Sequence, residues 1–212
     1  AFESSSRFHP FSSKFDDYLQ GKDELTPQEL EGFKLFKDPK KGNCLSCHVG
    51  NETSHNPQDW LFTDYTYDAL GGPKYQQARS ASKPDLGLCA QPGLAKKIPF
   101  QMRLETFCGA FKVPTLRNIA KTAPYLHNGV FSNLRDVVAF YATRDTQPAR
   151  WFPRNSRGFI EKFNDLPRSL RRNVNISEAP YDRRLNQSPR LSEAEIDAIT
   201  AFLATLTDRE KH

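Results

Sequence analysis

One five-residue motif, Cys44-Leu45-Ser46-Cys47-His48, constrains this chain more than any other stretch of its sequence. Two cysteines spaced C-x-x-C and followed directly by histidine form the pattern that attaches a c-type haem. Each thiol can bond to one vinyl group of the haem, and the histidine is then held under the iron as its proximal ligand. The motif therefore predicts covalent haem c, bound by Cys44, Cys47 and His48.

A C-x-x-C pair can also belong to a redox-active dithiol or to half of a zinc site. A zinc site needs a second ligand pair of similar spacing, but Cys89 and Cys108 lie nineteen positions apart and His55 stands alone. Haem attachment is therefore favoured over zinc, and we expect His55 and His9 to be surface residues.

Cys89 and Cys108 are the two cysteines outside the motif, and they suit an oxidising compartment. If they pair, the bridge constrains the unfolded chain by about 3 kcal/mol, because it closes a loop of about twenty residues. Two separate buried thiols are the alternative. We expect the disulfide, which would join the long loop after the haem motif to the segment before Pro114.

The length of 212 residues allows one large domain or one and a half small ones. Hydrophobic residues make up 37% of the chain, enough for a core that also packs around a haem. The sequence contains no run of eighteen apolar residues, so we expect no membrane span, and it does not open with a signal peptide. Because haem c is attached outside the cytoplasm, we expect an export signal to have been removed or to lie upstream, and the protein to be periplasmic.

The formal net charge of +5 is concentrated between residues 144 and 190. This stretch contains five acidic residues and eleven basic ones, namely Arg144, Arg150, Arg154, Arg157, Lys162, Arg168, Arg171, Arg172, Arg183, Arg184 and Arg190. Such an excess could steer an acidic protein partner toward this region. A solvated loop region without that role is the alternative. Nucleic acid is not expected as a partner, because the acids are interleaved and no nucleic-acid-binding motif is present.

A capping pattern predicts a helix directly ahead of the haem motif. Thr26 can cap this helix, Pro27 suits its first position, and Glu29 can close a capping box with Thr26. We expect the helix to run to about Lys37. A helix in this position is typical of a small cytochrome c domain.

Two amphipathic helices are expected nearer the C-terminus. Asn133 caps the first, and its apolar face is formed by Leu134, Val137, Val138 and Tyr141. Ser192 caps the second with Glu195 as its capping-box partner, and its buried face is formed by Ile196, Ile199, Phe202, Leu203 and Leu206. The second helix is expected to close the fold by packing on the first helix of the domain.

The sequence between these helices is rich in turn residues. Residues 49–111 and 144–190 are expected to be irregular, with a short helix from Thr115 to Lys121. Residues 1–24 are assigned to an N-terminal extension or inter-domain join, and residues 25–212 to the haem domain. The predicted class is all-α, a cytochrome c-like haem domain with long irregular loops.

Together with the haem motif, three further blocks resemble the bacterial di-haem cytochrome c peroxidase family, and within it the MauG-like branch. These blocks are Phe111-Lys112-Val113-Pro114-Thr115-Leu116-Arg117-Asn118, Thr122-Ala123-Pro124-Tyr125-Leu126-His127-Asn128-Gly129, and the segment from Leu134 to Tyr141. The resemblance extends from about Phe15 to Leu206.

Members of this family carry two haem domains in tandem, whereas this chain has one C-x-x-C-H motif and matches the C-terminal half. The resemblance therefore implies a second haem domain, on the same precursor or on a separate chain, unless this protein has dispensed with it. It also implies that the first twenty residues are the join that follows the first haem domain.

The resemblance also implies the identity of the sixth iron ligand. In the family this residue lies fourteen positions beyond the histidine of the second block, and it is methionine in typical peroxidases and tyrosine in MauG-like members. Here the histidine is His127 and the ligand position is Tyr141. Met102, the single methionine, is the first guess without the family, because His/Met ligation makes an electron carrier. From periodicity alone, Tyr141 is no more than part of a buried helical face.

Three further features carry over from the family. Backbone carbonyls at Thr122 and Pro124 are expected to bind calcium between the two domains, with a further ligand from the absent first half. His127 is expected near the haem interface, with a purely structural histidine as the alternative. Lys112 is expected to meet a haem propionate, with a surface lysine as the alternative. Tyr141, His127 and Lys112 are therefore the candidate catalytic residues.

Two functions from different classes remain. The first is an oxidoreductase, the electron-relay haem domain of a MauG-like di-haem peroxidase. There, hydrogen peroxide reacts at the partner haem, and this haem gives up an electron and shares the oxidising charge. Its substrate would be an acidic redox protein or a side chain of a protein substrate. The second is a stand-alone mono-haem electron-transfer cytochrome c. The number of haems per assembly distinguishes the two.

Overall fold

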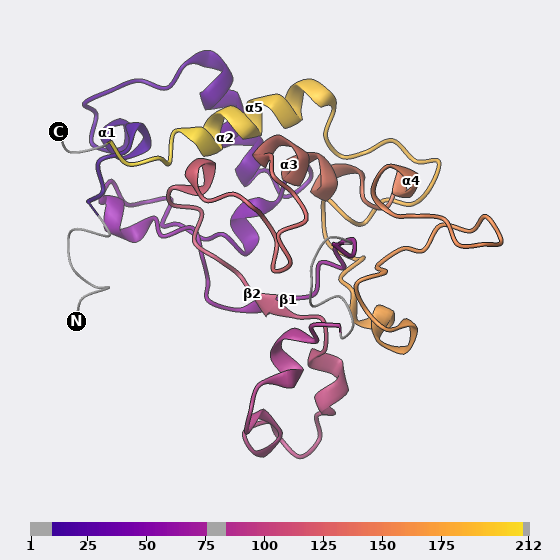
Figure 1. The fold of residues 1–212 in the computed structure, drawn as a ribbon. Coiled ribbons are helices and arrows are strands. Elements are labelled where there is room, and N and C mark those ends of the chain that lie inside the picture. The colour runs from indigo at the N-terminus through magenta and orange to yellow at the C-terminus, as the bar shows by residue number, and fades with distance from the viewer. Residues whose placement is uncertain (1–9, 76–83, 210–212) are drawn as a thin grey trace.

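Long loops surround a small group of helices in this chain (Figure 1). The computed structural model describes residues 10–75 and 84–209. In these residues the one sheet has two short antiparallel strands, β1 (Tyr67–Asp68) and β2 (Phe111–Lys112). The expected helical class with long irregular loops is confirmed, apart from this small sheet.

Two helices cross at the centre of the fold, α2 (Pro27–Lys37) and α5 (Glu193–Ala204). Each begins with the capping box that the sequence predicts. They approach closely because α2 has a glycine at the crossing: a Cβ on Gly32 would lie only 1.9 Å from the carbonyl oxygen of Ala198. Glycine at this position therefore allows the two backbones to touch.

The third predicted helix is α3 (Leu134–Thr143), which packs against α5. Its cap is also as predicted, since the amide of Arg135 donates to the side-chain oxygen of Asn133 at 2.8 Å. Val138 is buried in the core beside α5. Tyr141 is only partly buried in the protein because it borders a cavity.

The helix α1 (Lys14–Leu19) was not predicted from the sequence. It has its own capping box, in which the amide of Asp16 donates to the Ser13 hydroxyl and the Ser13 amide donates to the Asp16 carboxylate. Phe15 is fully buried and Leu19 nearly so, in the same core as α2 and α5. The described part of the segment assigned to an extension or join thus contributes to the core of the haem domain.

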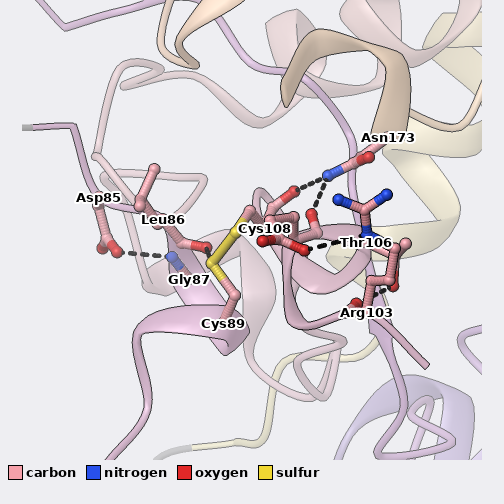
Figure 2. Close-up of a disulfide and its surroundings, with 9 residues drawn as sticks. Asp85, Leu86, Gly87, Cys89, Arg103, Thr106, Cys108 and Asn173 are labelled. Atoms are coloured by element: carbon pink, nitrogen blue, oxygen red, sulfur yellow. Dashed lines mark hydrogen bonds and ion pairs between the residues drawn. A yellow bond between two sulfur atoms is a disulfide. The ribbon is translucent and has the colours of Figure 1, made fainter. Parts of the chain in front are cut away.

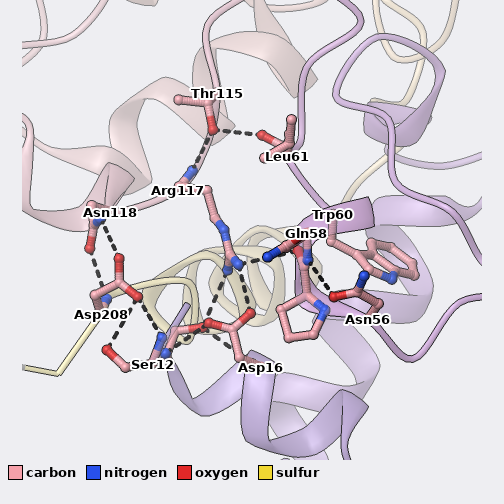
Figure 3. Close-up of polar contacts among 12 residues, drawn as sticks. Ser12, Asp16, Asn56, Gln58, Trp60, Leu61, Thr115, Arg117, Asn118 and Asp208 are labelled. Atoms are coloured by element: carbon pink, nitrogen blue, oxygen red, sulfur yellow. Dashed lines mark hydrogen bonds and ion pairs between the residues drawn. The ribbon is translucent and has the colours of Figure 1, made fainter. Parts of the chain in front are cut away.

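Polar contacts tie α1 to two distant parts of the chain (Figure 3). A buried ion pair joins Arg117 to Asp16 at 2.7 Å. The side chain of Asn118 donates to the carboxylate of Asp208 at 2.9 Å, and the amide of Ser12 donates to the same carboxylate at 2.8 Å. These contacts connect the beginning of the described chain, the segment after Pro114 and the C-terminal end.

The short helix expected from Thr115 to Lys121 is largely wrong, because only Ile119–Lys121 form a helical turn, of the 3-10 type. The hydroxyl of Thr115 donates to the carbonyl of Leu61 at 2.6 Å instead of taking part in a helix. Asn118 then adopts a left-handed conformation with φ of 60°, which breaks any helix that continues from Thr115.

Residues 144–190 are irregular as predicted, except for α4 (Pro148–Trp151) and a 3-10 helix at Arg168–Asn173. They are held by a second cluster of buried aromatic side chains, which includes Tyr125, Phe131, Phe140, Phe152 and Phe163. The cluster joins this region to α3, because Phe140 belongs to that helix.

The loop between the strands folds into a separate projection, residues 84–110, which we call the disulfide lobe (Figure 1). The predicted disulfide between Cys89 and Cys108 is confirmed (Figure 2). Two backbone hydrogen bonds close the base of the lobe, from the Leu88 amide to the Ala110 carbonyl and from the Gly109 amide to the Leu86 carbonyl.

One contact attaches the disulfide lobe to the rest of the molecule from the side (Figure 2). The side-chain amide of Asn173 donates to the carbonyl of Glu105 at 2.6 Å and to the carbonyl of Cys108 at 3.0 Å. The lobe is therefore held by its disulfide, by its base and by Asn173.

Candidate haem site

One cavity of about 420 Å³ brings together all eight residues to which the sequence gave a role. They are Cys44, Cys47, His48, Lys112, Thr122, Pro124, His127 and Tyr141. The haem motif supplies three of them, and β2, the turn after residue 121 and α3 supply the others. The fold therefore gathers the predicted residues around one space, while their individual roles stay predictions.

The haem motif folds as a tight turn at the wall of this cavity. Cys44–Ser46 form a turn of 3-10 helix that begins at Asn43, whose φ is 51°. The amide of His48 donates to the carbonyl of Cys44 at 2.9 Å. Burial raises the pKa of the Cys44 thiol to about 12 and also raises the pKa of Cys47. Both thiols are therefore protonated at neutral pH, and neither takes part in a disulfide.

His48 is oriented by backbone carbonyls. Its Nδ1 lies 3.1 Å from the carbonyl oxygen of Phe62 and 3.2 Å from that of Pro114. Because carbonyl oxygens only accept hydrogen bonds, Nδ1 carries the proton and Nε2 keeps its lone pair. Burial lowers the pKa of His48, which favours the neutral imidazole that binds metals. A carbonyl on the far nitrogen is how proteins commonly fix a histidine that ligates a metal.

The walls of the cavity suit a haem. Buried apolar side chains from α2, α3, α5 and the segment after β2 face it, namely Phe36, Val113, Leu116, Val138, Ile199 and Leu203. An apolar pocket with one neutral imidazole and two thiols on its wall has the donors that covalent haem c requires. The residues present therefore fit the group that the motif predicts.

Tyr141 lies on α3 and shares the cavity wall with a second tyrosine that the sequence did not indicate, Tyr181. The two ring centres are 5.7 Å apart. Burial raises the pKa of both phenols above the usual value, so both are neutral in the protein alone. A phenolate at Tyr141 would therefore require a nearby positive charge, such as that of a ferric iron.

A buried cation lies behind these two tyrosines. The guanidinium carbon of Arg144 is 4.6 Å from the ring centre of Tyr181, and the residue is only 1% exposed. Arg144 pairs with Asp145 and donates to the carbonyls of Leu70 and Asn175, each at 2.6 Å. From the sequence, Arg144 is only one member of a basic stretch. Its contacts with Leu70, Asn175 and Tyr181 join it to residues that are far away in the sequence.

Met102 does not border the cavity in the described structure. It lies in the disulfide lobe and is 52% exposed. This position agrees with the expectation that Met102 is not the sixth ligand.

His127 and Lys112 occupy different settings at the edge of the cavity. The ring of His127 stacks on Phe111 with centres 3.6 Å apart, and its Nε2 lies 2.7 Å from the carboxylate of Asp165. Lys112 is exposed, and its ammonium lies 4.8 Å from the ring centre of Tyr65. His127 therefore has structural partners that agree with either expected role, and Lys112 lies at the exposed edge of the cavity in contact with Tyr65.

Thr122 and Pro124, the expected calcium positions, lie in an exposed turn at the cavity. The Thr122 hydroxyl donates to the carbonyl of Ile119 at 3.2 Å. Within residues 10–75 and 84–209, no cluster of three or more His, Cys, Asp or Glu side chains is arranged to hold a metal ion. His55 is exposed as expected, whereas His9 lies outside the described residues.

The basic stretch between residues 144 and 190 contains many ion pairs. Six of its eleven cations form ion pairs with carboxylates, namely Arg144, Arg150, Lys162, Arg168, Arg171 and Arg190. Most of these carboxylates lie within the same stretch and are already counted in its charge balance, so its local excess of positive charge stays as the sequence indicates. No helix among the described residues is long and apolar enough to cross a membrane.

Comparisons with known proteins agree with the resemblance described from the sequence. No family model matches the chain. The chain is 34% identical over 216 residues to the methylamine utilization protein MauG of Paracoccus denitrificans, an alignment that covers 99% of this chain and 50% of that protein. It is 35% identical over 132 residues to cytochrome c551 peroxidase of Nitrosomonas europaea, covering 59% of this chain and 30% of that one. The chain thus spans half the length, or less, of these curated relatives.

Solved structures give the same result. The diheme peroxidase BthA from Burkholderia thailandensis superposes with a TM-score of 0.85 and 42% identity, covering 96% of this chain and 48% of that one. A MauG-like protein associated with microbial copper homeostasis superposes with a TM-score of 0.57 and 24% identity, over 94% of this chain and 52% of that one. The second likeness is one of fold alone.

Proposed function

We propose that this chain, which belongs to the MauG-like family of di-haem peroxidases, is the haem c domain that relays electrons within a two-haem oxidoreductase. The observation that carries the proposal is the cavity in which two thiols and the free Nε2 of His48 face apolar walls. Because the chain covers about half of its relatives, the proposed enzyme includes a second haem domain.

The residues of the cavity would perform distinct tasks. Cys44 and Cys47 would hold the haem through thioether bonds, and His48 would ligate the iron through Nε2 while two carbonyls keep its ring in place. When bound, the haem would supply an iron that exchanges single electrons. The apolar side chains would exclude water, which lowers the local dielectric and strengthens every charge interaction in the cavity.

Tyr141 is proposed to be a second protein ligand of the iron. Its position at the cavity wall supports this role, and a phenolate is a hard anionic ligand that favours oxidised iron and lowers the reduction potential. The charge of Arg144 would favour that phenolate, whereas the carboxylate of Asp68 would oppose it, since the two shift the pKa of Tyr141 in opposite directions. Tyr141 would thus adapt this haem to share an oxidising equivalent, which a simple electron shuttle does not require.

The remaining assignments follow from the family. Hydrogen peroxide would react at the second haem domain. The haem domain formed by the present chain would pass oxidising equivalents to an acidic redox protein or a protein side chain. His127 and Lys112 would act at the edge of the haem, where Lys112 is exposed and would meet a propionate. The carbonyls of Thr122 and Pro124 would contribute to a calcium site between the domains. Covalent attachment of haem c would require the protein to be exported, so the proposed location is the periplasm.

Covalent attachment is tested on a denaturing gel stained for haem. The colour should stay with the wild-type chain, because thioether bonds survive denaturation. A chain in which both Cys44 and Cys47 are replaced by serine should lose it. Wild-type haem that is extracted by acid acetone would refute the proposal.

The axial ligand is tested with Tyr141→Phe and a matched control, Met102→Leu. Tyr141→Phe should change the haem absorption spectrum and raise the reduction potential, because a neutral site replaces an anionic ligand. Met102→Leu should leave both unchanged, since Met102 lies in the disulfide lobe, away from the cavity. A Met102→Leu variant that loses its sixth ligand would overturn the assignment.

A stand-alone electron carrier is the second candidate, because one haem held by Cys44, Cys47 and His48 would be enough to exchange single electrons. The pyridine haemochrome assay and intact mass of the purified assembly distinguish the two functions. Two haems and reaction with hydrogen peroxide support the enzyme. One haem and no reaction with peroxide support the carrier.

A further inference from the structure

The end of the disulfide lobe presents apolar side chains to solvent. Phe100 is 100% exposed and Met102 is 52% exposed. Removing an apolar ring from water is favourable, so a ring held entirely in water is a source of binding free energy. No part of the chain that the structure describes covers this ring.

The same region is basic. Residues 91–103, which we call the lobe tip, contain Lys96, Lys97 and Arg103 and no acidic residue. Lys96 and Lys97 are exposed, and within the described structure neither forms an ion pair. Arg103 lies 3.6 Å from Glu105 across solvent, a contact of little strength. An apolar ring beside exposed cations is the pattern of a surface that binds an acidic protein.

The lobe tip extends from a restrained base, and that base lies beside the haem cavity. The Cys89–Cys108 disulfide and the contacts of Asn173 restrain the lobe. Gly109, at the base of the lobe, borders the haem cavity directly. A pre-positioned surface loses less entropy on binding than a flexible loop does, and a partner bound there is connected to the wall of the haem site through the lobe.

We propose that the lobe tip is the docking surface for the acidic face of a separate redox protein that exchanges electrons with this haem domain. Phe100 and Met102 form the apolar centre of the contact, where truncation is costly. Lys96 and Lys97 steer the encounter and set its salt dependence. The inference rests on the proposed function in one respect, because it takes the partner to be a redox protein.

Other occupants fit these observations less well. A second copy of the chain would bring the same basic tip and a net charge of +5, so the two copies would repel. Membrane surfaces are typically bound by clusters of about four to eight basic residues, and the lobe tip has three. The basic stretch at residues 144–190 is a weaker candidate, because five acidic residues are interleaved with its cations, whereas the lobe tip contains none.

The test measures binding of the haem-loaded chain to a reduced, acidic type 1 copper protein, by isothermal titration calorimetry without peroxide. The double variant Lys96→Glu/Lys97→Glu should weaken binding about tenfold or more at low ionic strength and flatten its salt dependence. Phe100→Ala should weaken binding about tenfold, through faster dissociation. Both variants change only exposed side chains, so neither should alter the haem spectrum.

The matched control is Lys22→Glu/Lys34→Glu, which makes the same change in net charge near α1 and α2, far from the lobe in Figure 1. It should leave binding within about twofold of wild type. Equal losses in the two charge variants would overturn the proposal, because net charge alone would then explain them. Binding to phosphatidylglycerol vesicles that requires Phe100, with no binding to the copper protein, would overturn it in favour of a membrane.

Hydroxyl-radical footprinting of the two-haem assembly completes the test. Phe100 and Met102 should react in the free assembly and become protected when the acidic protein is added. Protection before any addition would overturn the proposal, because the second haem domain would then cover the lobe tip. A wild-type chain that binds the acidic protein but fails to attach haem would refute the proposed function and leave the docking result unchanged.

Discussion

The crossing of α2 and α5 offers a sharp test of the packing, through Gly32→Ala. The new Cβ would lie 1.9 Å from the carbonyl oxygen of Ala198 and 2.9 Å from Cβ of Phe202. To bring the first contact to 3.0 Å, α5 would have to withdraw by about 1.1 Å, and a gap of that size forfeits a quarter to a half of each dispersion contact. Overpacking of this kind costs about 1–3 kcal/mol, or more where the backbone cannot yield.

Alanine also favours a helix over glycine by about 1 kcal/mol, which offsets part of that cost. Gly32→Ala should therefore lower the free energy of unfolding by about 2 kcal/mol. For a chain of this size the melting temperature should fall by about 4–8 °C. The measurement is guanidinium unfolding of the haem-loaded protein, followed by far-ultraviolet circular dichroism.

The neighbouring variant Glu31→Ala is the control, because Glu31 is exposed on the same helix, and its effect should stay within about 0.5 kcal/mol. Adding Ala198→Gly to Gly32→Ala should not restore stability, since the clash is with a backbone oxygen. A Gly32→Ala variant as stable as wild type would refute the reasoning.

Two further predictions concern stability. Cys89→Ser with Cys108→Ser should lower the free energy of unfolding by about 3 kcal/mol, and non-reducing peptide mapping of the wild type should find the linked peptides; two thiols that alkylate without reductant would contradict this. Arg117→Met should destabilise the protein by about 3–5 kcal/mol, because it leaves the Asp16 carboxylate buried without its cation. Adding Asp16→Asn should recover much of that loss in the same denaturation assay, and a double variant no more stable than Arg117→Met would show that the buried charge is not the cause.

The sequence predicted the parts of the fold that depend on local signals. The helices α2, α3 and α5 begin where their capping residues stand, because a cap acts over three or four positions. The helix α1 has the same signal in Ser13 and Asp16, but its six residues are too few to show a periodic apolar face. The expected helix at Thr115 failed because a contact with Leu61, fifty-four positions away, decides the conformation.

The same distinction between local sequence signals and distant contacts applies to the residues of the haem site. Cys44, Cys47 and His48 could be expected at one site because they are adjacent in the sequence, and Tyr141 because it lies within a block that resembles a family; all four border the cavity. Tyr181 and Arg144 could not be identified, since their importance comes from contacts between side chains that are about forty positions apart. The exposure of Phe100 was equally hidden, because the turn-rich sequence around it has no periodicity that separates a buried face from an exposed one.

The disulfide lobe leaves the haem domain and returns to it at nearly one point. The Cα atoms of Cys89 and Cys108 are 4.8 Å apart, and backbone hydrogen bonds link Leu88 with Ala110 beside them. The fold of the haem domain therefore depends little on the number of residues between the two cysteines. Doubling the length of such a loop costs only about 0.6 kcal/mol of stability. A foreign peptide, such as an affinity tag or a fluorophore attachment sequence, can be grafted here to report on the nearby haem without disturbing the fold.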